Sequence, residues 1–203
     1  MMYLSGRICK DKRLGLMMSY NANHTSKNMA QNISLLAIDN GCFSQPEKYC
    51  DDGYLNFLQD LNRTDCLFAT APDVLENHTK TKERSIPVLR QIRELGYKAA
   101  YVIQDGETVN SVCWDELDCI FIGGSTKYKL SMEAEQISLE ANKRNKWVHM
   151  GRVNTLTRFK NAKYMGCNSA DGNCIAFAPD KNEQEVLGWL DLLDNQPFME
   201  FQL

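Results

Sequence analysis

The sequence has no long hydrophobic run and no segment typical of a secreted or membrane-bound chain. No apolar stretch approaches the roughly 20 residues that a membrane-spanning helix needs, and the opening MMYLSGRICKDKR lacks the apolar segment of a secretory signal. The eight cysteines include no C-x-x-C pair, so neither a zinc ribbon nor a disulfide framework is favoured. We therefore expect a cytoplasmic protein whose cysteines are reduced and packed in the core as small hydrophobic residues.

Phosphate-binding and metal-binding motifs are missing as well. Neither G-x-G-x-x-G nor G-x-x-x-x-G-K-[ST] occurs, which removes support for the usual nucleotide-binding folds. The three histidines are scattered and there is no H-E-x-x-H, so we expect no metal site and no cofactor. The composition is that of an ordinary globular chain, and 203 residues are enough for one domain over 1–203.

Short apolar runs alternate with helical patterns along the whole chain. A helix is predicted over 79–96, where Pro87 interrupts it or delays its start, another over 131–144 with Ser131 as N-cap, and a last one over 182–195. Strands are predicted for the apolar runs between such segments. These runs are Met2–Leu4, Leu14–Met18, Leu35–Ile38, Cys66–Ala69, Ala99–Ile103, Cys119–Ile122, Trp147–Met150, Tyr164–Cys167 and a short ninth run, Cys174–Phe177.

This alternation predicts an α/β fold with parallel strands covered by helices. About eight strands favour a compact (β/α)₈ TIM-like barrel in a single domain, at the small end of the range for that fold. An open doubly wound sheet is the alternative. In either architecture the functional groups gather at the carboxyl ends of the strands.

Polar residues and glycines follow most of the predicted strands. Three of the acids, Asp39, Asp73 and Asp171, stand just after such runs. If they converge in one pocket, their mutual repulsion raises the pKa of at least one of them, which suits acid–base or nucleophilic chemistry. The other polar residues and glycines at strand ends include Asn40, Gln104, Gly123, Gly124, His149, Arg152 and Asn154.

The charge of the chain is unevenly distributed. The net charge is −3, yet residues 127–163 contain nine Lys or Arg and three Glu, a local charge of +6. A basic face on an acidic protein is compatible with a phosphate backbone as partner. It is equally compatible with a solvated helix face, and the charge pattern alone leaves both open.

At the strand ends the sequence resembles the tRNA-guanine transglycosylase superfamily, and within it the deazapurine DNA transglycosylase-like proteins of phages and bacteria. The stretch AIDNGCFS is similar to the D-S-G-G-[FY]-Q motif of the family, and the later motifs follow in the same order over about 14–178. The zinc motif of the tRNA enzymes is absent, which favours DNA as the substrate. The later matching stretches are APDV, VIQDG, IFIGGS, WVHMGRVNT and GCNSADG.

The resemblance implies a role for each matching residue. Asp171 would attack C1′ of a deoxyribose, and Asp39 would protonate or hydrogen-bond the leaving base. The base would be flipped out of the duplex or already unpaired. Asp105 replaces a family glycine, which implies that the base edge is read differently there. The implied base contacts are Asp73, Gln104, Gly123, Gly124, Asn40 and His149, and the implied nucleic-acid contacts are Lys127, Lys129, Arg152, Asn154 and Arg158.

The function implied by the resemblance is the exchange of guanine in DNA for a free 7-deazaguanine base, through an aspartate nucleophile. A DNA glycosylase that excises a base and leaves an abasic site would use the same pocket. A non-catalytic protein that binds a nucleobase or DNA is a further alternative. So is an unrelated barrel enzyme acting on a phosphorylated metabolite, which would carry a phosphate site at its last two strand–helix loops.

Overall fold

The apolar runs of the chain form eight parallel strands that close into a barrel, in which β1 pairs with both β2 and β8. The computed structural model describes residues 1–21, 28 and 30–194. Neighbouring strands follow one another in chain order all the way around, as in a TIM barrel. The strands are β1 Met2–Ser5, β2 Leu14–Ser19, β3 Leu36–Asp39, β4 Ala69–Thr70, β5 Ala99–Ile103, β6 Cys119–Ile122, β7 Trp147–Met150 and β8 Ser169–Gly172.

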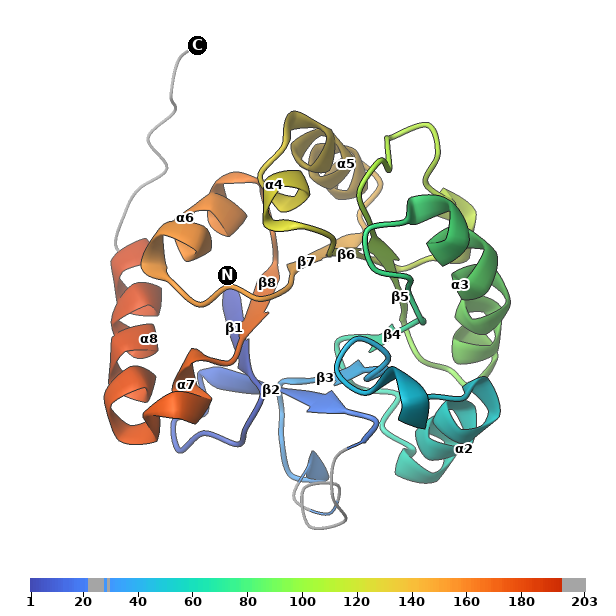
Figure 1. Ribbon diagram of the computed structural model, residues 1–203. Helices are drawn as coiled ribbons and strands as arrows, with labels where there is room; N and C mark the ends of the chain where they lie inside the picture. The colour runs from blue at the N-terminus through green and yellow to red at the C-terminus, as the bar shows by residue number, and fades with distance from the viewer. Residues whose placement is uncertain (22–27, 29, 195–203) are drawn as a thin grey trace.

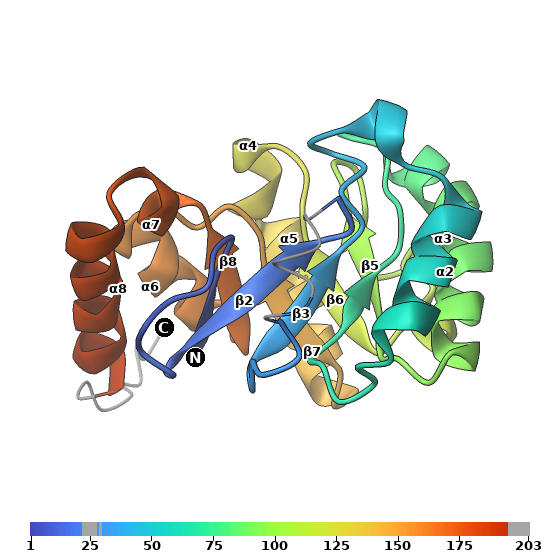
Figure 2. The ribbon, with the colours of Figure 1, turned by 90° about the horizontal axis from the view of Figure 1, so that it is seen from below.

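Helices follow the strands and surround most of the barrel, as Figure 1 shows in a view down its axis. Figure 2 shows the same strands from the side, inclined to the barrel axis. The connection from β1 to β2 contains no helix. The helices are η1 Pro46–Lys48, α2 Asp51–Leu61, α3 His78–Glu94, η2 Trp114–Glu116, α4 Thr126–Lys129, α5 Met132–Lys143, α6 Leu156–Tyr164, α7 Cys174–Phe177 and α8 Pro179–Asp194.

Successive side chains of a strand point to opposite faces, so the strands contribute to two separate cores. The larger core lies between the strands and the helices, and it includes Tyr3, Ile38 and Tyr101. The smaller core collects residues from strands all around the barrel that nevertheless contact one another, which places them inside it. Its buried members are Leu4, Met17, Ala37, Phe68, Ala100 and Cys119.

The structure corrects two of the predicted strands. The run Tyr164–Cys167 is not a strand, because Tyr164 ends α6 and Gly166 turns the chain with a φ of 80°. The last strand is instead β8, so Asp171 lies within a strand rather than after one. The run Cys174–Phe177 forms the short helix α7.

The expected helices are present, with one correction. Pro87 neither interrupts nor delays α3, which runs through it without a break. Pro87 lacks the N–H that would bond to the carbonyl of Glu83, and both residues are exposed, so this interruption of the helix hydrogen bonds lies on its solvent side. The Ser131 side chain accepts a hydrogen bond from Ala134 N and caps α5 as predicted.

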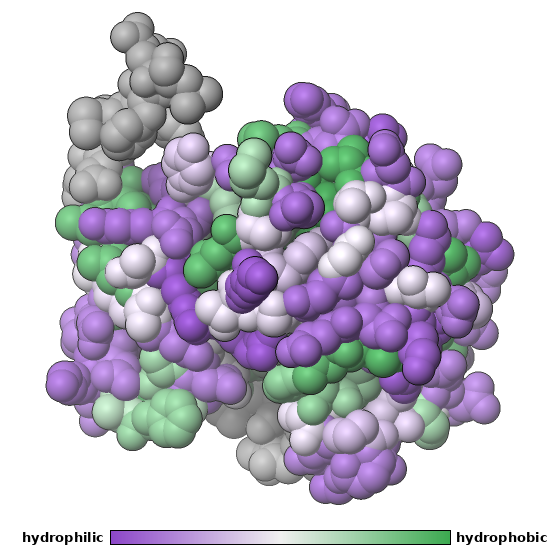
Figure 3. Space-filling view, turned by 45° about the horizontal axis from the view of Figure 1, so that its top comes forward, coloured by the Kyte–Doolittle hydropathy of each residue, from purple (hydrophilic) through white to green (hydrophobic). Residues whose placement is uncertain are grey.

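The surface drawn in Figure 3 is mostly hydrophilic, with small hydrophobic patches between the charged residues. Scattered patches of this kind are ordinary for a globular protein. All eight cysteines lie in the described residues and carry free thiols, and Cys66, Cys119 and Cys167 are buried as expected. Within the part of the chain that the structure describes, no helix is both long and apolar enough to cross a membrane.

Candidate active site

A cavity of about 970 Å³ opens at the carboxyl end of the barrel. Asp39, Asp73 and Asp171 all line it, although they lie far apart in the sequence. The barrel topology explains their meeting, because parallel strands deliver their ends to one rim. The convergence of the three acids predicted from the sequence is therefore present in the structure.

The alternation of side chains decides which groups point into the barrel. Ala37 belongs to the interior core, so Asp39, two residues later on β3, has the same inward orientation. Ser169 and Asp171 are related in the same way on β8. Apolar side chains fill the half of the barrel at the amino-terminal ends of the strands. These polar side chains continue the inward-facing rows toward the carboxyl ends.

Asp39 is the acid with the most strongly altered ionisation. Burial raises the pKa of Asp39 to about 7, and the nearby carboxyl groups of Asp171 and Asp73 act in the same direction. Hydrogen bonds from the backbone N–H groups of Gly41 and Asn40 oppose this increase. Asp39 therefore keeps its proton to a much higher pH than an ordinary aspartate, which allows the residue to act as an acid or as a base near neutral pH.

Asp73 and Gln104 lie side by side at the rim. Gln104 Nε2 donates to Asp73 Oδ2 at 2.6 Å, and Gln104 Oε1 accepts from the backbone N–H of Glu76 at 2.9 Å. The Cys42 thiol donates to the other carboxylate oxygen of Asp73 at 3.1 Å. Burial raises the pKa of Asp73, and the hydrogen bond from Cys42 opposes it. Both residues line the cavity, but Gln104 is 1% exposed, so Asp73 is the member of the pair that a ligand can reach.

His149 does not face the cavity as a base-contacting residue would. Its side chain is fully buried and its Nε2 lies 2.9 Å from Asp171 Oδ1. Its Nδ1 lies 2.8 Å from Ser169 Oγ, which also accepts a hydrogen bond from Trp147 Nε1 at 2.9 Å. The ring is therefore behind Asp171, and the structure corrects its predicted place in the site.

The predicted base contacts Gly123, Gly124 and Asn40 differ in whether their hydrogen-bonding groups are already bonded within the protein. Gly123 N–H donates to Ile103 O at 3.1 Å. It is therefore not available for the contact with a base that was predicted for it. Gly124 lines the cavity, and within the described residues its N–H has no hydrogen-bond partner. Asn40 is 2% exposed. Its amide is engaged by Ala71 O, Thr70 Oγ1 and Cys42 N, which orders the loop after β3.

Asp105 also acts within the protein. Its carboxylate accepts hydrogen bonds from the backbone N–H and the hydroxyl of Ser125. It is absent from the residues that line the cavity. We expected that Asp105, which replaces a glycine of the family motif, changes how a base edge is recognised. The structure corrects this expectation, because Asp105 orders the loop between β6 and α4.

The basic residues are only partly placed as predicted. Lys129 is 4% exposed and donates from Nζ to Gly151 O at 2.8 Å, so it cannot hold a phosphate on the surface. Burial lowers the pKa of Lys129 to about 8, with Arg152 and Arg158 acting in the same direction. Arg152 is exposed at the cavity mouth, over the ring of Phe43 at 5.0 Å. Lys127 is exposed and Arg158 is half-buried.

Asn154 is exposed, but its side-chain oxygen is already used. Asn154 Oδ1 accepts from the backbone N–H groups of Asn173 at 2.8 Å and Cys174 at 3.1 Å. These amides begin the turn that leads into α7, where a barrel acting on phosphorylated metabolites often binds its phosphate. The engaged amides weaken that alternative function.

Several residues of the site were not predicted from the sequence. Arg7, in the loop after β1, and Phe43 both line the cavity and are exposed. Trp147 and Ser169 form the hydrogen-bonded chain behind His149. The spacing of two between Ser169 and Asp171 would have identified Ser169, had the last strand been placed correctly.

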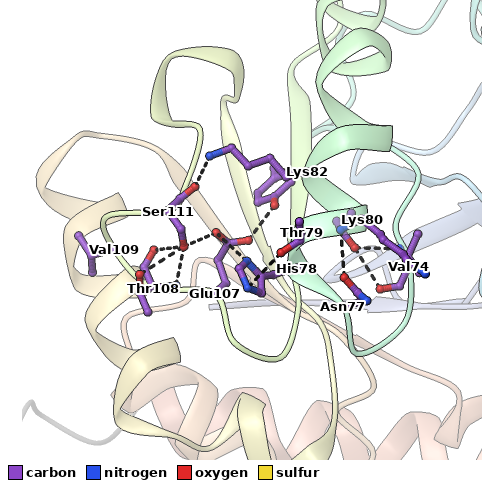
Figure 4. A network of polar contacts seen from close by, with 12 residues as sticks. Val74, Asn77, His78, Thr79, Lys80, Lys82, Glu107, Thr108, Val109 and Ser111 are labelled. Atoms are coloured by element: carbon purple, nitrogen blue, oxygen red, sulfur yellow. Dashed lines mark hydrogen bonds and ion pairs between the residues drawn. The ribbon is translucent and has the colours of Figure 1, made fainter.

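A second polar network lies outside the cavity, between the β5–β6 connection and α3 (Figure 4). Its centre is Glu107, which is fully buried and accepts from Tyr101 OH at 2.7 Å and Ser111 Oγ at 2.6 Å. Lys82 donates to Ser111 O at 2.7 Å, and His78 Nδ1 lies 4.0 Å from Glu107. This network joins two elements rather than forming a ligand site. Among the described residues, no group of three His, Cys, Asp or Glu side chains is placed to hold a metal ion.

No family model and no curated protein matches the chain. Among solved structures it is similar to a mutant FabK from Thermotoga maritima, at 12% identity and a TM-score of 0.47 over 77% of this chain and 50% of that one. It is also similar to tryptophan synthase from M. tuberculosis, at 10% identity and a TM-score of 0.49 over 77% and 58%. A third is the PaMucR phosphodiesterase with c-di-GMP, at 15% identity and a TM-score of 0.45 over 71% and 62%.

The chain thus spans 50–62% of the length of these three structures. At such identities and scores the likeness does not bear on substrate or reaction. None of the three is named as a transglycosylase. The chemistry of the site has to be argued from its own residues.

Proposed function

We propose that the protein cleaves the N-glycosidic bond of a nucleotide in DNA, with Asp171 as nucleophile, and replaces guanine by a 7-deazaguanine base. The observation that carries this proposal is that Asp171 and Asp39 line one cavity, with Asp39 protonated in part at neutral pH. Enzymes that cleave glycosidic bonds with retention use two carboxyl groups in this way, one as nucleophile and one as acid.

The proposed reaction has two displacements at C1′. In the first, a carboxylate oxygen of Asp171 forms a bond to C1′ while the bond from C1′ to the base nitrogen breaks. The base leaves with that electron pair and takes the proton of Asp39. In the second, Asp39, now a carboxylate, removes a proton from the incoming base as its nitrogen attacks C1′, and Asp171 leaves as a carboxylate. The covalent intermediate divides one difficult step into two easier ones.

Recognition would be divided between the rim and the mouth of the cavity. The Asp73 carboxylate, held in place by the buried Gln104, would contact the base, and the Gly124 N–H, which has no hydrogen-bond partner within the described residues, would donate to a base carbonyl. Arg7 and Arg152, exposed at the mouth, would contact phosphates together with Lys127 on the nearby helix α4. The target nucleotide has to be flipped out of a duplex or unpaired to reach Asp171, at a cost of a few kcal/mol.

The test is mass spectrometry of the nucleosides of DNA incubated with the protein, with and without a 7-deazaguanine base. The wild type is expected to insert the added base, and Asp171→Asn is expected to lower the rate at least about 10³-fold because the nucleophile is lost. Asp60→Asn, on the exposed face of α2, removes an acid far from the chemistry and should leave the rate unchanged.

The outcomes separate the competing functions. Abasic sites formed without any added base would replace exchange by a glycosylase, in which water takes the place of the incoming base. DNA that stays unmodified and intact under both conditions would contradict both enzymatic functions. Binding of DNA that is unaffected by Asp171→Asn, in the absence of turnover, would support the non-catalytic alternative.

A further inference from the structure

The inward-facing residues of β7 and β8 form a hydrogen-bonded chain that ends at Asp171. Trp147 Nε1 bonds to Ser169 Oγ, Ser169 Oγ to His149 Nδ1, and His149 Nε2 to Asp171 Oδ1, at 2.9, 2.8 and 2.9 Å. Of these groups only Asp171 lines the cavity, with 18% of its side chain exposed. His149 and Ser169 are fully buried beneath it, and Trp147 is half-buried at the start of β7.

The donors and acceptors of this chain fix the hydrogen shared by His149 and Asp171. An indole N–H can only donate, so Ser169 Oγ accepts from Trp147 and keeps one hydrogen to give. A carboxylate can only accept, so His149 must carry a hydrogen on Nε2 to bond to Asp171. In the neutral ring Nδ1 is then an acceptor, which takes the Ser169 hydroxyl hydrogen.

Two aromatic rings, which also contact each other, pack against the imidazole ring and limit its movement. Its centroid lies 5.0 Å from that of Phe68 and 4.6 Å from that of Phe121. Phe68 belongs to the apolar core inside the barrel and cannot move without opening a void there. Together with this packing, the contacts of the two ring nitrogens with Ser169 and Asp171 direct Nε2 at Asp171.

We infer that His149 is a positioning residue for Asp171: its Nε2–H holds Oδ1 of the carboxylate and leaves Oδ2 directed at the cavity. This inference rests on the proposed function, because it assigns Oδ2 as the atom that attacks C1′. In the neutral ring, a hydrogen bond from Ser169, whose Oγ accepts from Trp147, favours the tautomer with a hydrogen on Nε2.

The same hydrogen bond would act in both displacements. A carboxylate accepts a stronger hydrogen bond than an ester carbonyl does. In the first step Nε2–H therefore fixes the orientation of the attacking carboxylate. In the second step the bond strengthens as Asp171 regains its negative charge, which favours its departure from C1′. Loss of the donor should lower the turnover rate and leave DNA affinity unchanged.

Two substitutions at this position separate the hydrogen bond from the packing. His149→Leu fills much of the same space without a donor, whereas the side-chain amide of His149→Gln reaches the position of Nε2 and restores one. We expect His149→Leu to lower the rate of base release roughly 10- to 100-fold, the usual effect of losing a hydrogen bond to a charged group. His149→Gln should recover most of this loss, with an unchanged KM for DNA in both variants.

The nitrogen resonances of the His149 ring test the hydrogen bond without reference to turnover. In ¹⁵N-labelled wild type we expect a protonated Nε2 and an unprotonated Nδ1, with the Nε2 resonance shifted by Asp171→Asn. A ring protonated only on Nδ1 would overturn the inference, and so would an active wild type whose rate is unchanged in His149→Leu. A wild type that releases no base overturns the proposed function and the catalytic part of the inference, while the resonances still report whether His149 holds Asp171.

Discussion

Asp39 combines an inward position on a strand with two acidic neighbours, and this makes its ionisation depend on folding. In the folded protein its pKa is about 7, compared with 3.8 for an aspartate free of such influences. Between these values the folded state binds a proton that the unfolded chain has released. Folding stability therefore decreases as the pH rises from about 4 to about 7 and stays at the lower value above that range.

Asp39→Asn is expected to remove this pH dependence. The amide oxygen can still accept from the backbone N–H groups of Gly41 and Asn40, but no buried charge develops. The variant should be more stable than the wild type at pH 8, by on the order of 2–4 kcal/mol, and nearly equal to it at pH 4. Urea unfolding at pH 4, 6 and 8 measures the difference, with Asp60→Asn as the exposed control. A difference between variant and wild type that is constant with pH would contradict the argument.

At the scale of elements, Glu107 shows how a buried acid can hold a loop to a strand, since it accepts from Tyr101 on β5. Glu107→Ala leaves the buried hydroxyl of Tyr101 without its acceptor and removes one of the two acceptors near the half-buried Ser111 hydroxyl. We expect a loss of roughly 3 kcal/mol in the free energy of unfolding, measured in urea. Glu107→Gln keeps an acceptor oxygen and should lose less than half as much. Equal losses in the two variants would show that the hydrogen bonds are not the source of the stability.

The elements also show what the sequence could and could not predict. The strand before Asp39 was predictable because its residues are apolar on both faces. The N-cap Ser131 was predictable because it stands just before acidic residues. Strand β8 was missed because its inward residues, Ser169 and Asp171, are polar for the sake of the site, so no apolar run marks it. A cluster of basic residues in the sequence does not show which of their side chains are buried. The burial of Lys129 could therefore not be predicted.

For the whole molecule, the closed barrel divides its interior into two halves. Apolar side chains fill the amino-terminal half, and the cavity with its acids occupies the carboxyl-terminal half. The order of the first seven strands was predictable from the rhythm of the sequence, and so was the meeting of three acids at one rim. The hydrogen-bonded chain behind Asp171 was not predictable, because it depends on which strands are neighbours and on the exact register between β7 and β8.

Phe68 connects the two halves, since it is fully buried in the interior core and contacts the ring of His149. Phe68→Ala would leave a void in the middle of the barrel. The strands cannot move inward to fill it, because each strand is hydrogen-bonded to a neighbour on both sides. We expect a loss of about 3–5 kcal/mol in the free energy of unfolding, and Phe68→Leu, which keeps most of the volume, should lose clearly less. Phe43→Ala removes the same ring where it is 55% exposed at the cavity mouth and serves as the control in urea unfolding. A loss in Phe68→Ala no larger than in Phe43→Ala would mean that the barrel interior does not depend on this side chain.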